Sequence, residues 1–327
     1  MHAAPLDALY LDNFRSIKGA PNENHGRELL ELHTVGRASG YTEAMVKDSA
    51  KILSGWTVGT TTDWAVFYDQ AKHTTGPVTV LEFSDANAAS DGRELAERYL
   101  RFLANHPATA RTIARKLALR FVSDTPSDAL VEVLAATYLS SGTDITAMLR
   151  QLVIHPEFVG SAGRKVRNTV DDLVATARVL QVEVHTPTRN ESFARAIAYA
   201  HKGILLWQWP RPDGAPERNA DWASASRMLG SFRMHWNMAG GYYPKVDATY
   251  KTARWWLPQR RLRLDEYVDH MCRMVLGRGS TSRDLKAVCQ ATGRAPGEIV
   301  TKDHPLVRYL FVRMVVCLLD SPSHMSR

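Results

Sequence analysis

The sequence predicts a mainly α-helical fold: an irregular multi-helix domain with one short β-hairpin and long loops rich in proline and tryptophan. Three observations support this class. Apolar residues recur at spacings of three and four along most of the chain, as on the buried face of a helix. Residues that cap helices precede these segments. Only one pair of segments has the alternating pattern of strands. With 327 residues, 45% of them hydrophobic, the chain can bury a substantial core.

The helices are delimited by their capping residues. Asn22 and Asn24 can cap a helix that runs to residue 35 and stops at Gly36. Thr42 caps the next helix, which ends at Gly55. A hairpin is expected from residues 64–68 and 78–83. The other helices are expected at residues 91–105, 107–121, 125–139, 143–154, 170–180, 191–202, 223–232, 265–276, 282–292 and 305–319.

A proline-rich stretch, residues 209–216, interrupts the helical pattern. Its prolines exclude it from a helix interior, because proline lacks the backbone N–H and clashes with the preceding turn. The stretch therefore predicts a loop between two regions, residues 1–205 and 206–327, that pack as one unit. The first region would hold the helix of residues 22–35 and the hairpin.

The charge pattern disfavours a nucleic-acid partner. The formal net charge is +7, but the basic residues are scattered and form no long tract. A nucleic-acid site needs a basic face, ideally with aromatic rings for stacking. The densest basic stretch lies beside Trp255 and Trp256, and a solvated helix flank explains it more simply. Its members are Arg254, Arg260, Arg261 and Arg263.

Cysteine content and hydropathy exclude two further classes of protein. The three cysteines are an odd number and form no CxxC pair, so no disulfide framework is expected. The longest apolar segment, residues 306–319, is interrupted by Arg308 and Arg313, so no transmembrane helix is predicted. No signal peptide is recognisable at the start of the sequence.

Five segments occur together in one order along the chain. They are residues 22–36 (NENHGRELLELHTVG), 40–43 with 55–56 (GYTE, GW), 105–122 (NHPATA, then KL and RFV), 155–158 (HPEF) and 210–222 (PRPDG, then Trp222). Together they resemble the hallmark segments of a bacterial domain-of-unknown-function family, numbered 1800. The resemblance covers essentially the whole chain.

The resemblance implies a location and a partner. Many members of that family carry export signals and are encoded beside a secreted sulfatase-like protein, which is therefore a candidate partner. Two features depart from the family. Its members usually have Tyr or Phe and then Ala where this chain has His25-Gly26. Residues 9–13 (LYLDN) resemble a segment that lies well inside the family's domain, so the chain is expected to lack the family's N-terminal part and to expose apolar surface around residues 9–32.

The helix of residues 22–35 carries the main candidate site. At about 100° per residue, Asn24, Arg27, Glu28 and Glu31 fall on one face, whereas His33 lies opposite, among leucines. Glu28 and Glu31 are weak candidates for metal ligands, because glutamates three residues apart can share a metal and no second helix of that type is evident. The favoured alternative is a buried polar network, with Arg27 paired to Glu31 and Asn24 as a cap.

Other candidate residues surround this helix in the predicted architecture. His73 lies in the hairpin loop, and loops often carry functional residues. Arg111 and Arg115 lie on a basic helix that could bind phosphate, sulfate or an acidic glycan, although an exposed face is the commoner outcome. Glu28 is expected to pair with this helix, with His73 or with residues 12–13.

Three functions remain open at this point. The first is a cell-envelope protein that binds or processes a polar or saccharide-like ligand at a carboxylate and arginine cluster, its aromatic loops being suited to sugar stacking. The second is a non-catalytic scaffold or partner of the sulfatase-like protein, and the third is nucleic-acid binding. No glycine-rich phosphate loop and no GxSxG nucleophile motif occurs, so the sequence leaves the reaction and any cofactor or metal unknown.

Overall fold

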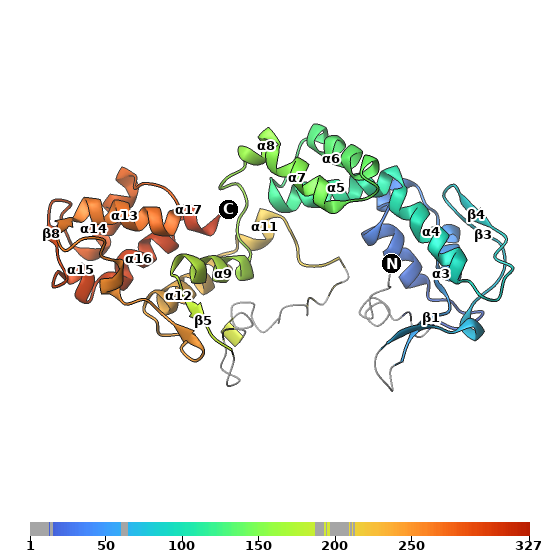
Figure 1. Ribbon diagram of the computed structural model, residues 1–327, viewed down its shortest axis with the longest axis horizontal. Coiled ribbons are helices and arrows are strands. Elements are labelled where there is room, and N and C mark those ends of the chain that lie inside the picture. The colour runs from blue at the N-terminus through green and yellow to red at the C-terminus, as the bar shows by residue number, and fades with distance from the viewer. Residues whose placement is uncertain are drawn as a thin grey trace. The chain divides into compact units, whose positions relative to one another are not determined.

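The fold was analysed in a computed structural model that describes residues 13, 16–59, 65–186, 193, 195–196, 209, 211 and 213–327. The predicted mainly helical class is confirmed, since helices dominate and the sheets are short two-stranded ones (Figure 1). The chain divides into two compact units. Unit 1 comprises residues 1–160 and 211–214, and unit 2 comprises residues 161–210 and 215–327.

Unit 1 is built from helices joined by short strands. It begins with α2 (Glu23–Glu28), a π-helical turn η2 (Leu29–His33), η3 (Arg37–Ser39) and α3 (Glu43–Leu53). The strands are β1 (Trp56–Val58), β2 (Val66–Tyr68), β3 (Val78–Val80) and β4 (Phe83–Asp85), with η4 (Gln70–Lys72) between β2 and β3. Five helices follow: α4 (Arg93–Asn105), α5 (Pro107–Phe121), α6 (Asp128–Ser140), α7 (Ile145–Ile154) and α8 (Pro156–Val159).

Two apolar clusters hold unit 1 together. One lies around α3, α4 and β3, where Leu30, Ile52 and Tyr99 are fully buried. The other lies among α5, α6 and α7, around Ala114 and Leu134. Leu30 is fully buried and Leu29 packs on the first cluster, whereas Ile17 is 54% exposed. Residues 9–12 lie outside the described residues, so the apolar surface expected around residues 9–32 stays a prediction.

The predicted hairpin is wrong in its pairing. Residues 64–68 and 78–83 do not pair with each other; β2 pairs antiparallel with β1, and β3 pairs antiparallel with β4. The sequence pattern did not predict the correct partners because, among the described residues, four strands of three residues each follow one another between residues 56 and 85. Leu81 takes a positive φ of 54° in the tight turn between β3 and β4, a conformation that the alternation of apolar residues does not signal.

Unit 2 is a second helical assembly. Its first part contains α9 (Thr169–Val179), β5 (Glu183–Val184), α11 (Asn219–Trp222), α12 (Ala225–Ala239), β6 (Ala248–Thr249) and η5 (Ala253–Trp256). Its second part contains β7 (Leu262–Arg263), α13 (Leu264–Leu276), α14 (Ser282–Thr292), β8 (Ile299–Val300), α15 (Pro305–Arg308), α16 (Phe311–Leu319) and α17 (Pro322–Met325). Strand β5 pairs with β6, and β7 pairs with β8, both antiparallel.

The core of unit 2 is formed by α13 and α16 with the helices around them. Leu264, Val268, Met271 and Met314 are fully buried there. The last residues of the chain are fixed to the first residues of the unit by backbone hydrogen bonds from Lys165 N to Arg327 O (3.1 Å) and from Arg167 N to Met325 O (2.9 Å). This pairing places the short helix α17 beside α9.

Several predicted boundaries shift in the structure. The units divide after Gly160 and not at residue 205, and the expectation that two regions pack as one unit stays a prediction. The helix expected at residues 223–232 continues to Ala239, and the one expected at 305–319 is interrupted between α15 and α16. The helix expected at 191–202 lies mostly outside the described residues.

Candidate functional site

The predicted site on the residue 22–35 segment is only partly assembled. Asn24 is exposed and does not cap the helix; Asn22 is the cap, and its side chain accepts hydrogen bonds from the backbone of Asn24 and His25. Arg27 does not pair with Glu31. It donates instead to both carboxylate oxygens of Glu43 on α3, at 2.7 and 2.5 Å.

The π-helical turn η2 explains the failed pairing. Glu31 lies within this turn, whereas Arg27 lies in the α-helix before it. A π-helix bonds residue i to i+5, so the rotation of 100° per residue assumed for an α-helix does not apply beyond Glu28. Glu31 pairs with Arg37, 2.5 Å away, and accepts a hydrogen bond from Tyr41 at 3.3 Å.

Glu28 and Glu31 nevertheless line a shallow cleft in unit 1. The cleft has a volume of about 490 Å³ and is also lined by Leu32, Arg37, Arg211 and Asp213. Burial raises the pKa of Glu28, and the nearby carboxylates of Glu31 and Asp213 raise it further. The cleft thus combines the predicted acidic pair with two arginines, one of them from the proline-rich loop.

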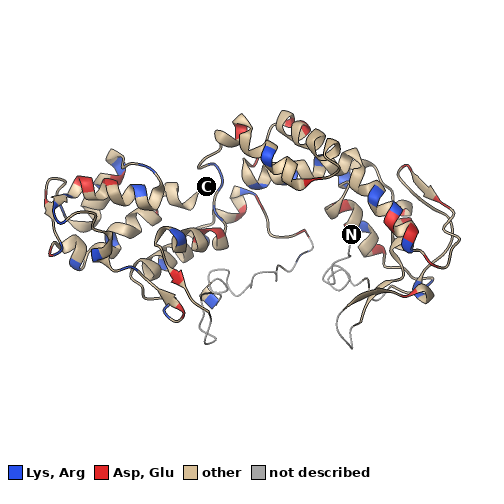
Figure 2. Cartoon of the chain, in the orientation of Figure 1, with Lys and Arg blue, Asp and Glu red and all other residues tan. Residues whose placement is uncertain are grey.

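The other predicted partners lie elsewhere. Arg111 pairs with Glu132 at 2.9 Å and Arg115 pairs with Asp128 at 2.9 Å, so both face α6 and neither pairs with Glu28. Two arginines of the basic helix are therefore neutralised by carboxylates of α6. Figure 2 shows the same interleaving of basic and acidic residues on the helices of both units.

His73 is buried and does not line the cleft of unit 1. It is 1% exposed, and its ring contacts Ser54 O at 3.0 Å and Asn87 Oδ1 at 2.9 Å. A Cβ atom at Gly92 would lie 2.3 Å from the ring, so the α4 N-terminus packs directly against it. His73 was a candidate because it lies in a loop, but its position in the sequence did not reveal that its side chain is buried.

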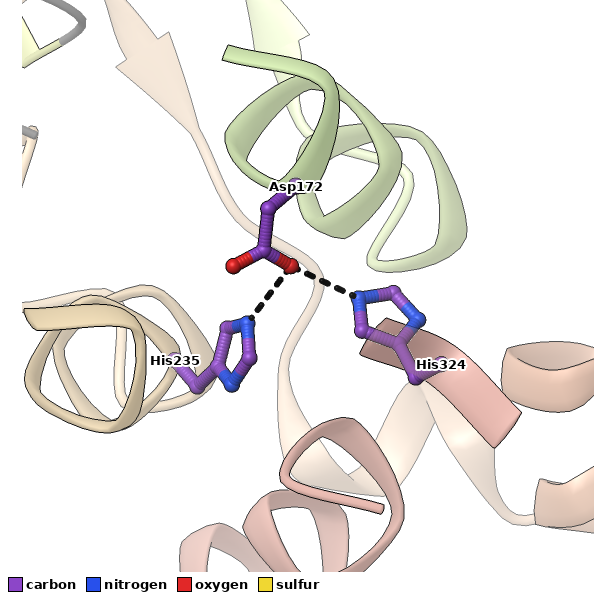
Figure 3. Close-up of side chains that lie close together, drawn as sticks. All are labelled: Asp172, His235 and His324. Carbon is purple, nitrogen blue, oxygen red and sulfur yellow. Dashed lines mark hydrogen bonds and ion pairs between the residues drawn. The ribbon is translucent and has the colours of Figure 1, made fainter. Parts of the chain in front are cut away.

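A cluster that the sequence analysis overlooked lies in unit 2. Asp172 on α9, His235 on α12 and His324 on α17 are all buried, and each offers a ligand atom within 4.8 Å of the others (Figure 3). Asp172 Oδ1 lies 3.2 Å from His235 Nε2 and 3.8 Å from His324 Nε2. We call these three residues the Asp-His-His cluster.

Helix α12 contributes a stripe of polar residues to this cluster. Arg227, Ser231 and His235 are spaced by four, which places them on one face of the helix. Ser231 donates to Asp172 Oδ2 at 2.5 Å, and the Arg227 guanidinium lies 3.3 Å from the same oxygen. The second carboxylate oxygen of Asp172 is thereby held, while the first faces the two histidines.

His235 lies between two carboxylates. Its Nδ1 is 2.7 Å from Asp320 Oδ1 at the end of α16, and its Nε2 faces Asp172. Burial disfavours the imidazolium, but the hydrogen bonds to Asp172 and Asp320 outweigh it and raise the pKa of His235. Burial and the charge of His235 lower the pKa of His324 to about 4. The carboxylate of Asp172 and the guanidinium of Arg227 are thus packed out of water, whereas the side chain of Asp320 is 25% exposed.

An aromatic cleft of about 590 Å³ lies beside the cluster in unit 2. Arg227 connects the two, since it lines the cleft and contacts Asp172 of the cluster. The rings of Trp209 and Trp222 lie 6.4 Å apart at 55°. Other residues that line this aromatic cleft are Asp221, Arg233, Asn237 and Tyr243.

Little in the sequence signals these residues. Asp172, His235 and His324 are separated by long intervals and form no spaced metal motif. The available signal was the four-residue spacing of Arg227, Ser231 and His235, in a helix that was expected to end at residue 232. Of the two tryptophans of the basic stretch, Trp256 is 2% exposed and packs on Phe311, whereas Trp255 is 48% exposed.

The fold and site define a mainly helical protein in which a buried Asp-His-His cluster adjoins an aromatic cleft. The chain belongs to the family described as "Protein of unknown function (DUF1800)", which matches residues 4–326. No curated protein and no solved structure matches the chain. Within the described ranges, none of the helices combines the length and apolar character needed to span a bilayer.

Proposed function

We propose that this protein binds or processes a polar, saccharide-like ligand, and that the ligand lies in the aromatic cleft of unit 2. The observation that carries the proposal is the composition of that cleft. Trp209, Trp222 and Tyr243 line it together with arginine, aspartate and asparagine side chains. A volume of about 590 Å³ is in the range of small-molecule sites.

The chemistry of a sugar matches this lining. The apolar faces of a pyranose ring pack on aromatic side chains, and its hydroxyl groups need convergent hydrogen-bond donors and acceptors. Asp221 supplies acceptors, Asn237 supplies both kinds, and Arg233 supplies donors. Arg227 is held at the wall by Asp172 and by Arg167 O, the latter at 2.6 Å. Its buried Nε has no hydrogen-bond partner among the described residues.

Binding is better supported than hydrolysis. Glycoside hydrolysis ordinarily uses two carboxyl groups that flank the scissile bond. Among the described residues that line the cleft, Asp221 is the one carboxylate. The cleft of unit 1 offers Glu28, Glu31 and Asp213 but lacks an aromatic ring in its described lining. Because it has the carboxylates but no aromatic ring among its described residues, the cleft of unit 1 ranks second as a position for the same ligand.

The family resemblance supports a location in the cell envelope, where a saccharide-like ligand would be met. It also supports a co-encoded, secreted sulfatase-like protein as a partner. The location and the partner are both inferred from the export signals and neighbouring genes of other family members, and both are part of the proposal.

A glycan array followed by calorimetry tests the proposal. The full chain should bind one class of glycan, and Arg233→Ala should weaken that binding by about tenfold or more, because a hydrogen bond to a charged group contributes about 1.5–3 kcal/mol. Arg233 is exposed, so its loss should leave the fold intact. Arg283→Ala on α14 removes the same charge outside the cleft and should bind normally. Equal binding by both variants would contradict the assignment.

A scaffold role is the second candidate function, and an exposed apolar surface favours it. On α7 and α8, five apolar side chains are 36–70% exposed: Ile145, Leu149, Val153, Ile154 and Val159. Contiguous apolar surface of this kind is characteristic of protein interfaces. Val153→Glu should abolish co-purification with the sulfatase-like protein, whereas Val133→Glu, on α6, should not. Retention of the complex by Val153→Glu would count against this surface.

A further inference from the structure

We propose that the Asp-His-His cluster is a site for a divalent transition-metal ion of the zinc type, held by Asp172 Oδ1, His235 Nε2 and His324 Nε2. Two imidazole nitrogens and one carboxylate oxygen are ligands that zinc and ferrous iron accept. The proposal does not depend on the ligand suggested for the aromatic cleft. It concerns three buried side chains from α9, α12 and α17 that converge in Figure 3.

The spacing of the three atoms supports a metal. Zinc lies about 2.0–2.2 Å from nitrogen and oxygen ligands, so neighbouring ligands of a tetrahedral site lie about 3.4 Å apart. The distances of 3.2 and 3.8 Å from Asp172 Oδ1 to the two histidine nitrogens bracket that value. The 3.8 Å separation is too long for a hydrogen bond, so a direct bond from His324 to this oxygen does not explain the arrangement.

The groups around the cluster are those that orient metal ligands. Metal-binding histidines usually donate their other ring N–H to a carboxylate or carbonyl, which fixes the tautomer. His235 Nδ1 has that partner in Asp320, at 2.7 Å. Ser231 and Arg227 hold the other oxygen of Asp172. Thr176 Oγ1 forms a hydrogen bond with His324 Nε2 at 3.0 Å, and a metal bound to this nitrogen would replace that bond.

The position of the third proposed ligand, His324, is fixed by backbone hydrogen bonds outside the cluster. His324 lies on the four-residue helix α17, which has little stability of its own. The backbone pairing of residues 165–167 with 325–327 fixes it, and Arg167 Nε donates to His324 O at 2.7 Å. A site completed from the end of the chain would tie α9, α12 and α17 together. Metal binding should therefore stabilise unit 2.

A competing explanation for the buried cluster is that a proton on His235, and not a metal ion, balances the charge of the carboxylates. An imidazolium at His235 between two carboxylates also balances the charge. The two cases differ in what the protein retains on purification and in its response to added metal. A metal adds the free energy of binding to the stability, by RT ln(1 + [L]/Kd), whereas the proton network is unaffected by zinc or by a chelator.

Elemental analysis of the purified full-length protein, followed by thermal unfolding after chelation and with added ZnSO₄, tests the proposal. About one equivalent of metal per chain and a rise in Tm with zinc are expected. His324→Gln should lose both effects. His304→Gln is the matched control, since His304 is a largely buried histidine of unit 2 paired with Glu298 at 3.1 Å and lies outside the cluster. It should keep both.

Three results would overturn the metal site. The first is that the wild-type protein is folded, contains no stoichiometric metal and shows no change in Tm when zinc is added. Another is zinc binding by His324→Gln that equals that of the wild type. Should His324→Gln fail to fold, Co²⁺ replaces zinc in the wild-type protein. Tetrahedral coordination with nitrogen ligands should then give visible d–d absorption bands, and the spectrum of octahedral aqueous Co²⁺ would refute the site.

Discussion

Individual residues in this protein depend on partners that sequence spacing does not reveal. Arg27 and Glu31 are close in sequence, yet Arg27 binds Glu43 and Glu31 binds Arg37. Asp172 and His324 are distant in sequence, yet they share one buried cluster. Local periodicity could predict which residues share a helix face. It could not predict which distant helix would meet that face, because tertiary packing decides it.

Asp284 offers a test of electrostatics at the residue scale. It accepts hydrogen bonds from Arg278 at 2.7 Å and from the Thr281 hydroxyl at 2.7 Å. The bond to Arg278, chiefly, lowers the pKa of Asp284 to about 2, against 3.8 in a model peptide. Because the folded-state pKa is depressed, the stabilising effect is complete above about pH 4 and is lost as the pH falls toward 2.

Asp284→Asn should therefore lower the free energy of unfolding by about 2 kcal/mol at pH 7. The difference from wild type should shrink as the pH falls below 4. Urea unfolding at a series of pH values measures it. Asp303→Asn, in an exposed turn, is the control and should show no such trend. A difference for Asp284→Asn that stays constant down to pH 3 would refute the assigned pKa.

Among the elements of unit 1, α2 and α3 approach each other closely at Gly26. A Cβ atom on Gly26 would lie 2.6 Å from Val46 O and 2.8 Å from Ala50 N, so the two helices touch backbone to backbone. Glycine in a helix costs about 1 kcal/mol relative to alanine. The close backbone contact gives a physical reason for glycine at this position.

Gly26→Ala should destabilise the protein by about 1–3 kcal/mol, despite the better helix propensity of alanine, because the helices must separate. Gly230→Ala on α12 is the matched control. Nothing lies within 4 Å of a Cβ at Gly230, so alanine there should be neutral or stabilise by up to about 1 kcal/mol. Thermal unfolding of both variants gives the comparison, and a stabilised Gly26→Ala would contradict the packing described here.

Element boundaries show which local signals were informative. The starts of α3, capped by Thr42, and of α14, at Ser282, were predicted well, because a helix cap is a local interaction between neighbouring residues. The helix expected to start at residue 125 begins instead at Asp128, with Ser127 as its cap. The π-helical turn η2 and the pairing of the strands were not predictable. The first depends on how residues 29–33 fit the core, and the second depends on a positive-φ turn at Leu81.

For the whole molecule, composition and periodicity predicted the helical class, and the family segments predicted the membership that covers residues 4–326. The division into units was not where the proline-rich loop suggested. Residues 211–214 belong to unit 1 although the residues on either side belong to unit 2. Part of that loop therefore helps to line the cleft of unit 1, which brings Arg211 and Asp213 beside Glu28.

We propose that the ligand lies in the aromatic cleft of unit 2 and not in the cleft of unit 1. The most direct measurement compares the affinities of Asn237→Ala and Glu28→Gln for the glycan selected on the array, by calorimetry on the full chain. Asn237 lines the aromatic cleft, and Glu28 lines the cleft of unit 1. We predict that Asn237→Ala weakens binding several-fold and that Glu28→Gln binds like the wild type. Loss of binding in Glu28→Gln, with Asn237→Ala unchanged, would place the ligand in unit 1 and contradict this account.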